Sequence, residues 1–218
     1  MASLVLTGWC GTEFAKMAAH TLPVLEAYAK RHGHDFACAN LFGDRPASWM
    51  KVLLLHKALS KYDRIAWIDT DVVVMRDDAD ILAELPEGQW QGMVEHDTDC
   101  GMVPNCGVWI VTQDMLPVLT DAWNCGEDIN HGWWEQAAIL RRMGYAVTDS
   151  PHASLDTPTT LYERTTFLDA TWNHHPRDRR RVESPRFVHV TQYIDRLGVI
   201  RELCGRAAPA PAAGGGLE

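Results

Sequence analysis

Two carboxylates, Asp69 and Asp71, stand one residue apart within a largely apolar segment that extends over residues 62–75. The segment is rich in β-branched residues, which predicts a buried strand. Alternation along a strand would send both carboxylates to one side and Thr70 to the other. Two anions held this close repel each other unless a cation lies between them, so the spacing predicts a site for a metal and a diphosphate.

A simpler interpretation of Asp69 and Asp71 is a solvated strand-to-loop turn, where aspartate is common. The apolar segments 65–68 and 72–74 would, however, bury the surroundings of the pair. A buried carboxylate pair costs free energy unless a metal or strong hydrogen-bond donors stabilise it. The flanking sequence therefore favours the metal site.

Composition limits the classes of protein to consider. The 218 residues are 46% apolar and 22% charged, enough for one sizeable core. The formal charge of −9 argues against a nucleic-acid partner, whose phosphates it would repel. The 6 cysteines show no Cys-x-x-Cys spacing, which favours reduced structural thiols. No apolar stretch approaches the ~18 residues that span a bilayer, so we expect a cytoplasmic protein without a membrane span.

Apolar strands alternate with amphipathic helices through the first two thirds of the chain. Strands are expected at 3–7, 34–39, 62–75, 91–95 and 107–111, and helices at 12–29, 49–59, 80–85, 114–123 and 133–143. The segment between 95 and 107 is expected to form a loop. This order predicts a single α/β domain with a mainly parallel sheet flanked by helices. In such sheets ligands bind at the carboxyl ends of strands, where Asp69 and Asp71 fall.

The last third of the chain has a different character. Residues 149–186 contain several prolines and are interpreted as a functional loop set or a partner-binding lobe. Within them, the basic run 177–181 is interpreted as a solvated turn. The segment 206–218 is rich in alanine, proline and glycine, cannot bury a core and is predicted to be disordered, with part of it a remnant of cloning.

Several segments taken together resemble the GT-A fold nucleotide-sugar glycosyltransferases, and among them family 34, which holds fungal α-galactosyltransferases and plant xyloglucan xylosyltransferases. These segments are 28–36, 45–51, 67–71, 105–108, 134–136 and 187–189, and the resemblance covers most of residues 3–190. It implies a GT-A (Rossmann-like) domain over residues 1–205. It also implies a metal-dependent enzyme that transfers a hexose or pentose from a UDP-sugar to an acceptor with retention of anomeric configuration.

The resemblance assigns roles to individual residues. Asp69, Asp71 and His189 would hold the metal, and this ligand set suits Mn²⁺, with Mg²⁺ less favoured by the nitrogen ligand. The metal would neutralise the charge that builds on the departing diphosphate. Gln136 would lie near the anomeric carbon and Glu135 would contact hydroxyls of the donor sugar. The alternative for the last two is that they merely begin a helix.

Other positions carry weaker assignments. The remaining donor contacts implied by the resemblance are Thr7, Lys51 and Thr70 on the nucleotide and Asn105 on the sugar, and each also has an ordinary structural interpretation. After His189 the family usually shows a Gly-Cys or Gly-x-x-Lys pattern that binds diphosphate, and this chain has Val-Thr-Gln-Tyr at 190–193. Arg196 is expected to supply the missing charge. Residues 172–175, which include Trp172, fall where an acceptor would bind.

Two other functions compete with glycosyl transfer. A phosphatase of the haloacid dehalogenase type also carries Asp-x-Asp after an apolar strand, but on the first strand of its domain, whereas 68 residues precede Asp69 here. A GT-A scaffold that binds sugar nucleotides without catalysis is the other alternative. The donor (UDP-galactose, UDP-glucose or UDP-xylose), the acceptor (small molecule, glycan or protein) and the oligomeric state are all left open by the sequence.

Overall fold

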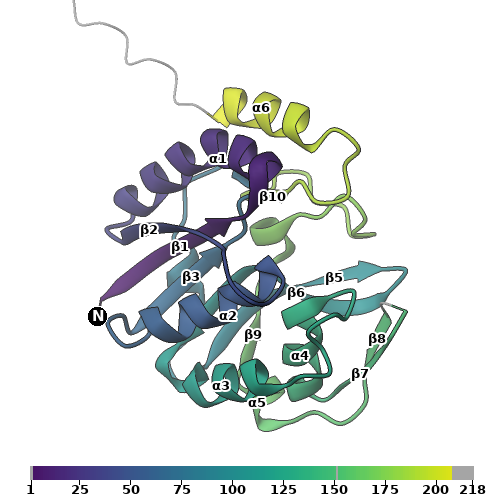
Figure 1. The fold of residues 1–218 in the computed structure, drawn as a ribbon. Helices are drawn as coiled ribbons and strands as arrows, with labels where there is room; N and C mark the ends of the chain where they lie inside the picture. Colours follow the sequence, from purple (N-terminus) through teal and green to yellow (C-terminus); the bar gives the residue numbers. More distant parts are fainter. Residues whose placement is uncertain (1, 151, 208–218) are drawn as a thin grey trace, which may run out of the picture.

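A six-stranded sheet with helices on both faces organises the protein (Figure 1); the computed structural model describes residues 2–150 and 152–207. The strand order is β2 (Asp35–Asn40), β1 (Ser3–Trp9), β3 (Arg64–Ile68), β6 (Gly101–Thr112), β5 (Gln91–Thr98) and β9 (Thr165–Phe167). The pairs β1–β2, β1–β3 and β5–β9 are parallel, whereas β6 runs antiparallel to both β3 and β5. The predicted α/β fold with a mainly parallel sheet is confirmed.

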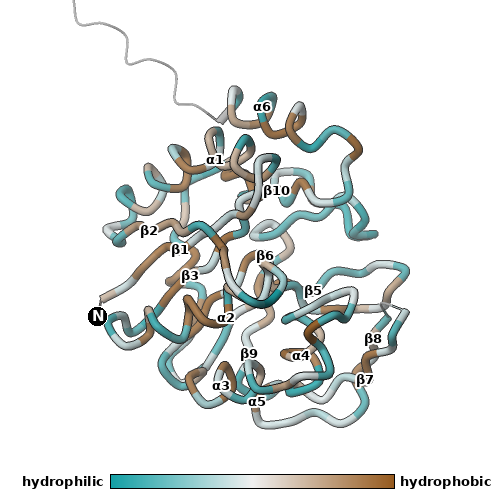
Figure 2. Tube along the Cα trace, viewed as in Figure 1, coloured by the Kyte–Doolittle hydropathy of each residue, from teal (hydrophilic) through white to brown (hydrophobic). Residues whose placement is uncertain are grey.

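The helices divide between the two faces of the sheet. One face carries α1 (Gly11–Arg31), with α6 (Arg196–Ala207) packed on it, and the other carries α2 (Ala47–Ala58), α3 (Leu116–Asn124), α4 (Trp134–Met143) and the short α5 (Thr160–Glu163). Three 3₁₀ turns are η1 (Ile81–Glu84), η2 (Gln113–Met115) and η3 (Ala170–Asn173). Hydrophobic and hydrophilic residues alternate along α1 and α6 in Figure 2, as expected for helices with one buried side.

Two hydrophobic cores lie on opposite faces of the sheet because strand side chains alternate. Along β3, Ile65 and Trp67 join the core under α2, α3 and α4, while Ala66 and Ile68 join the core under α1. Burial on both faces explains why β3 reads as a continuous apolar run. The sheet is therefore a rigid support for the residues that follow its strands.

The segment carrying Asp69 and Asp71 is not one strand, and the prediction for 62–75 is wrong in this respect. β3 ends at Ile68, and β4 (Val72–Val74) leaves the main sheet to pair antiparallel with β10 (Phe187–His189). Between them the chain turns, with the Val72 N–H donating to the Asp69 carbonyl at 3.0 Å. Because β3 and β4 are both buried, the residues on either side of the turn are apolar. The hydropathy pattern therefore does not show that one strand ends and another begins. A turn, rather than strand alternation, brings the two carboxylates together.

The loop expected between 95 and 107 is also wrong, because β5 and β6 form one long antiparallel hairpin. Its register shifts between Met93 and Val94, and its tip carries Cys100. The turn-forming residues correctly predict the tip of the hairpin. The pairing of β5 with β6 near the tip is not predicted, because polar residues interrupt the apolar pattern of both strands. In the segment expected to be irregular, β8 (His152–Leu155) pairs with β7 (Tyr145–Thr148).

The C-terminal part of the described chain is helical. Helix α6 runs through Arg206 to Ala207, two residues that the sequence analysis assigned to the tail. The remainder of the predicted tail, 208–218, lies outside the described residues. Within the described ranges, no helix combines the length and the apolar character needed to cross a membrane.

Candidate active site

Asp69, Asp71 and His189 meet at the carboxyl end of β3. Potential ligand atoms of these three side chains all lie within 4.8 Å of one another. The antiparallel pairing of β10 with β4 places His189 opposite Val72, next to the acidic turn. The structure thus brings together the three residues expected to hold a metal, two of which, Asp71 and His189, are only 5% exposed.

Asp71 lies between His189 and Arg196. His189 Nε2 is 3.4 Å from Asp71 Oδ1, and Arg196 Nη1 is 3.4 Å from Asp71 Oδ2. Burial alone would raise the pKa of Asp71, but the charges of His189 and Arg196 outweigh burial and lower it. In turn, burial acts to lower the pKa of His189, and Asp71 raises it. Asp71 is therefore ionised at neutral pH.

This cluster has the chemistry of a divalent-cation site. Two carboxylates and an imidazole are suitable ligands for Mn²⁺, and neighbouring ligands of such an ion lie about 3 Å apart. The 3.4 Å between His189 Nε2 and Asp71 Oδ1 is close to that spacing. The Nδ1 of His189 is buried without a hydrogen-bond partner among the described residues. The residues fit a metal.

Asp69 is anchored through one of its two oxygens. Oδ1 accepts hydrogen bonds from Trp67 Nε1 at 2.6 Å and contacts Lys51 Nζ at 3.1 Å. No protein group in the described chain bonds to Oδ2. One oxygen thus fixes the carboxylate, and the other is available to an ion.

Lys51 is a buried cation, 3% exposed, rather than a surface lysine. Its ammonium group contacts Asp69 Oδ1, Glu135 Oε1 at 3.0 Å and the Cys106 carbonyl at 3.0 Å. Burial acts to lower the pKa of Lys51, but the two carboxylates raise it above its usual value. The structure places Lys51 between Asp69 and Glu135, where it supports the site, and its expected contact with the nucleotide stays a prediction.

Glu135 is held at the same junction. Its Oε1 pairs with Lys51, whereas Oε2 is buried without a partner in the described structure. Burial raises the pKa of Glu135, although Lys51 opposes that shift. A buried carboxylate oxygen without a partner is suited to accept a hydrogen bond from a sugar hydroxyl.

Thr7 and Thr70 lie behind the acidic turn. Thr7 is buried within β1, and its hydroxyl has no partner among the described residues. The Thr70 hydroxyl donates to the Gly8 carbonyl, and the Thr70 carbonyl accepts from the Thr21 hydroxyl at 2.9 Å. Thr70 therefore ties the turn to β1 and α1, while its expected contact with the nucleotide stays a prediction.

Gln136 and Asn105, from different segments of the chain, meet at the other side of the site. Gln136 Oε1 accepts hydrogen bonds from Asn105 Nδ2 and from the Cys106 N–H, both at 3.1 Å. Helix α4 begins just before Gln136, at Trp134, whose φ of +45° is unfavourable for a residue with a side chain. Such local strain is concentrated at functional sites.

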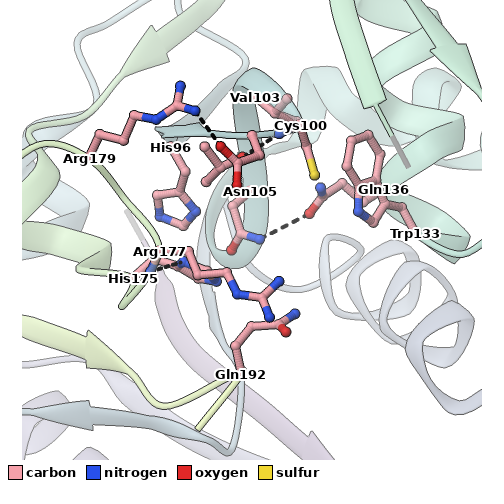
Figure 3. Close-up of a pocket in the computed structure, with 12 residues that line it drawn as sticks. His96, Cys100, Val103, Asn105, Trp133, Gln136, His175, Arg177, Arg179 and Gln192 are labelled. Atoms are coloured by element: carbon pink, nitrogen blue, oxygen red, sulfur yellow. Dashed lines mark hydrogen bonds and ion pairs between the residues drawn. The ribbon is translucent and has the colours of Figure 1, made fainter. Parts of the chain in front are cut away.

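Gln136 and Asn105 line a pocket of about 670 Å³ (Figure 3). Its other walls include His96, Trp133, His175, Arg177 and Gln192. The sequence pointed to His175 on the acceptor side but gave no signal for His96 or Gln192. Trp172, expected near an acceptor, is instead buried in the core against Phe187.

Two histidines of the pocket are neutral at physiological pH. Burial lowers the pKa of His96 to about 3 and that of His175 to about 4, and in each case the other nearby histidines add to the shift. His96 Nε2 lies 2.8 Å from the Asn173 carbonyl, which can only accept, so Nε2 carries the proton. Nδ1 of His96 is left as a hydrogen-bond acceptor.

These pKa values predict sensitivity to acid. The unfolded chain binds protons near pH 6.5, but the folded state leaves His96 and His175 neutral down to about pH 3 and 4, so stability falls as the pH drops below about 6.5. Each histidine contributes a slope of about 1.4 kcal/mol per pH unit. The variant His96→Gln keeps a donor for the Asn173 carbonyl and should remove one such slope. Urea unfolding between pH 7 and 4 measures it; an unchanged slope would contradict the burial of a neutral His96.

Gly107 makes room for the His189 ring. A Cβ added there would collide with the His189 ring, including Nδ1 at 2.8 Å, and would lie 2.8 Å from Asn105 Oδ1. We expect Gly107→Ala to displace His189 and to weaken Mn²⁺ binding about 10- to 100-fold, which calorimetry would measure. Gly126→Ala is the matched control, because a Cβ there meets nothing within 4 Å. Equal Mn²⁺ affinity of the two variants would argue against His189 as a ligand.

Several solved structures with a similar architecture are glycosyltransferases. The chain is similar to a glycosyltransferase involved in the glycosylation of the major capsid of PBCV-1, with a TM-score of 0.70 and 16% identity over 93% of this chain and 100% of that one. It is also similar to the galactosyltransferase LgtC (TM-score 0.58, 13% identity, 96% and 98% covered) and to mouse xyloside xylosyltransferase 1 (TM-score 0.52, 10% identity, 87% and 97% covered). A scan against protein-family models and a search of the curated proteins each give no match.

These likenesses establish the GT-A fold for this chain. The resemblance that the sequence showed to GT-A fold glycosyltransferases is thereby confirmed at the level of the fold. At 10 to 16% identity the shared architecture does not carry over donor, metal or residue roles. Those roles depend on the residues of the site.

Proposed function

We propose that the protein is a metal-dependent, retaining glycosyltransferase that transfers a hexose or pentose from a UDP-sugar to an acceptor. The observation that carries this proposal is the meeting of Asp69, Asp71 and His189 at a strand end of a GT-A fold. The pocket beside Gln136 supports it, since its size suits a sugar.

In this proposal each part of the site has a task. Asp69, Asp71 and His189 bind Mn²⁺, which when present neutralises the charge on the leaving diphosphate. Arg196, next to Asp71, adds a positive charge on the diphosphate side. Glu135 Oε2 accepts a hydroxyl of the donor sugar, and Gln136 lies beside the anomeric carbon. Retention would follow from departure and attack on the same face of the sugar.

The phosphatase alternative is disfavoured by the fold. In the dehalogenase arrangement the Asp-x-Asp motif lies on the first strand of the domain, whereas here it follows β3. The solved structures that this chain resembles have the GT-A fold instead. Binding without catalysis remains an outcome that the experiment below distinguishes.

The test is calorimetric titration with UDP-galactose, UDP-glucose and UDP-xylose, each with Mn²⁺ and with chelator, followed by an assay for UDP release. We expect one donor to bind only with Mn²⁺ and to be hydrolysed slowly when no acceptor is present. Metal-dependent binding without UDP release would favour the non-catalytic module. Binding that is indifferent to chelator, or none for any UDP-sugar, would overturn the proposal.

A further inference from the structure

Three side-chain amides form a continuous hydrogen-bonded relay beneath the pocket. Asn173 Nδ2 donates to Asn105 Oδ1 at 2.9 Å, and Asn105 Nδ2 donates to Gln136 Oε1 at 3.1 Å. The three residues come from η3, β6 and α4, so tertiary structure alone assembles the relay. Figure 3 shows its last link, from Asn105 to Gln136.

Backbone donors fix the direction of the relay. The Gly107 N–H donates to Asn105 Oδ1 at 2.9 Å, and the Cys106 N–H donates to Gln136 Oε1 at 3.1 Å. A backbone N–H can only donate, so each contact identifies which end of the amide is oxygen. Gln136 Oε1 therefore accepts two hydrogen bonds. Its Nε2 has no protein partner in the described ranges and is left for a molecule in the pocket.

Asn173 stands at the far end of the relay and is fully buried, with 0% of its surface exposed. Its Oδ1 has no hydrogen-bond partner in the described structure, which costs free energy that an apolar side chain of similar size would avoid. What asparagine provides here is the Nδ2 donor to Asn105. The backbone carbonyl of Asn173 accepts separately from His96, so this anchor does not depend on the side chain.

We propose that Asn173 is a positioning residue that, through Asn105, holds the Gln136 carboxamide with its nitrogen toward the donor sugar. Gln136 then recognises the sugar as a hydrogen-bond donor, because its oxygen is engaged by Asn105 and Cys106. This inference rests on the proposed function in one respect, namely that a donor sugar occupies the pocket beside Gln136.

Two substitutions at Asn173 separate positioning from packing. Asn173→Asp keeps the shape but, at a pH where its carboxylate is ionised, presents only acceptor oxygens to Asn105 Oδ1. This repulsion is relieved if the Asn105 and Gln136 amides turn over in sequence. Asn173→Ala removes the first link but leaves the backbone donors that hold the other two amides. If Asn173 acts by positioning Gln136, the aspartate variant should lose more kcat than the alanine variant. If Asn173 acts only by packing, the alanine variant should lose more, because it leaves a cavity.

The kinetic experiment measures kcat and KM for UDP-sugar hydrolysis with Mn²⁺. We expect N173D to lower kcat by about tenfold or more and N173A by about threefold, with KM for the donor within about twofold of wild type. The matched control is N124D, because Asn124 is exposed at the end of α3. A larger kcat loss in N173A than in N173D, or a change confined to KM, would overturn the positioning role.

A spectroscopic readout is independent of turnover. In ¹⁵N-labelled protein the side-chain amide resonances of Gln136, assigned by their loss in Gln136→Met, should shift in N173D and in N173A but not in N124D. Unmoved resonances in both Asn173 variants would overturn the relay. If N173D does not fold by thermal melting, the N173A spectrum decides. If wild type binds no UDP-sugar, the proposed function fails while the spectrum still tests the relay.

Discussion

Replacing Asp71 with asparagine is expected to abolish metal-dependent donor binding and to lower turnover by on the order of 10²- to 10³-fold. Asparagine keeps the size of the side chain but loses the negative charge, so His189 and Arg196 no longer have a carboxylate between them. A divalent cation would then meet one carboxylate instead of two. Calorimetry with Mn²⁺ and a UDP-sugar, and UDP release, measure the two effects.

The matched control for this variant is Asp121→Asn, because Asp121 is 71% exposed on α3 and pairs with Arg142 at the surface. Melting temperatures of both variants report whether the fold survives. His189→Asn should weaken Mn²⁺ binding less than Asp71→Asn, since both carboxylates remain. A folded Asp71→Asn protein with normal Mn²⁺ dependence would show that the metal assignment is wrong.

The parts of this site that the sequence predicts are those whose residues lie close together along the chain. Asp69 and Asp71 share one short segment, so their proximity was predicted correctly even though alternation on a single strand was the wrong reason. The pairing of β10 with β4, which brings His189 to the turn, is a long-range contact that no local pattern encodes. There the family resemblance supplied what periodicity could not.

Long-range contacts also explain why some residues of the pocket were not predicted. His96 faces the pocket because β5 and β6 pair as a long hairpin, whereas the sequence analysis expects a loop between 95 and 107. A single histidine in a strand is ordinarily structural, so nothing in the sequence distinguished it. Asn173 is a still clearer case, because its importance comes entirely from Asn105, which lies on another element.

Lys51 differs, because its burial was readable. It lies one residue before Val52 and four before Leu55, and both of these are buried in the core. The helical period therefore places Lys51 on the buried face of α2, where a lysine needs carboxylate partners. The sequence analysis gives Lys51 as a nucleotide contact or an ordinary structural residue, although the helical period of 49–59 already favours its burial.

Replacing Lys51 with methionine is expected to destabilise the protein by about 3–5 kcal/mol, because it leaves buried carboxylates without their cation. Among the described residues, Glu135, which is 4% exposed, loses its only ion pair, and Asp69 Oδ1 keeps only the Trp67 contact. Urea unfolding at pH 7 measures the free energy. The matched control is Lys61→Met, an exposed lysine just after α2, which should change it by less than about 0.5 kcal/mol.

The double variant Lys51→Met with Glu135→Gln decides whether the loss comes from the unpaired charge or from packing. If the charge of Glu135 causes it, neutralising that carboxylate should recover a substantial part of the stability, about 1–2 kcal/mol. No recovery would assign the loss to packing around Lys51 and would contradict the ion-pair argument. Recovery of stability without recovery of Mn²⁺ binding would show that Lys51 also fixes Asp69 in place. Lys51 would then both stabilise the core and orient Asp69 as a metal ligand, because its contacts join α2, α4 and the turn after β3.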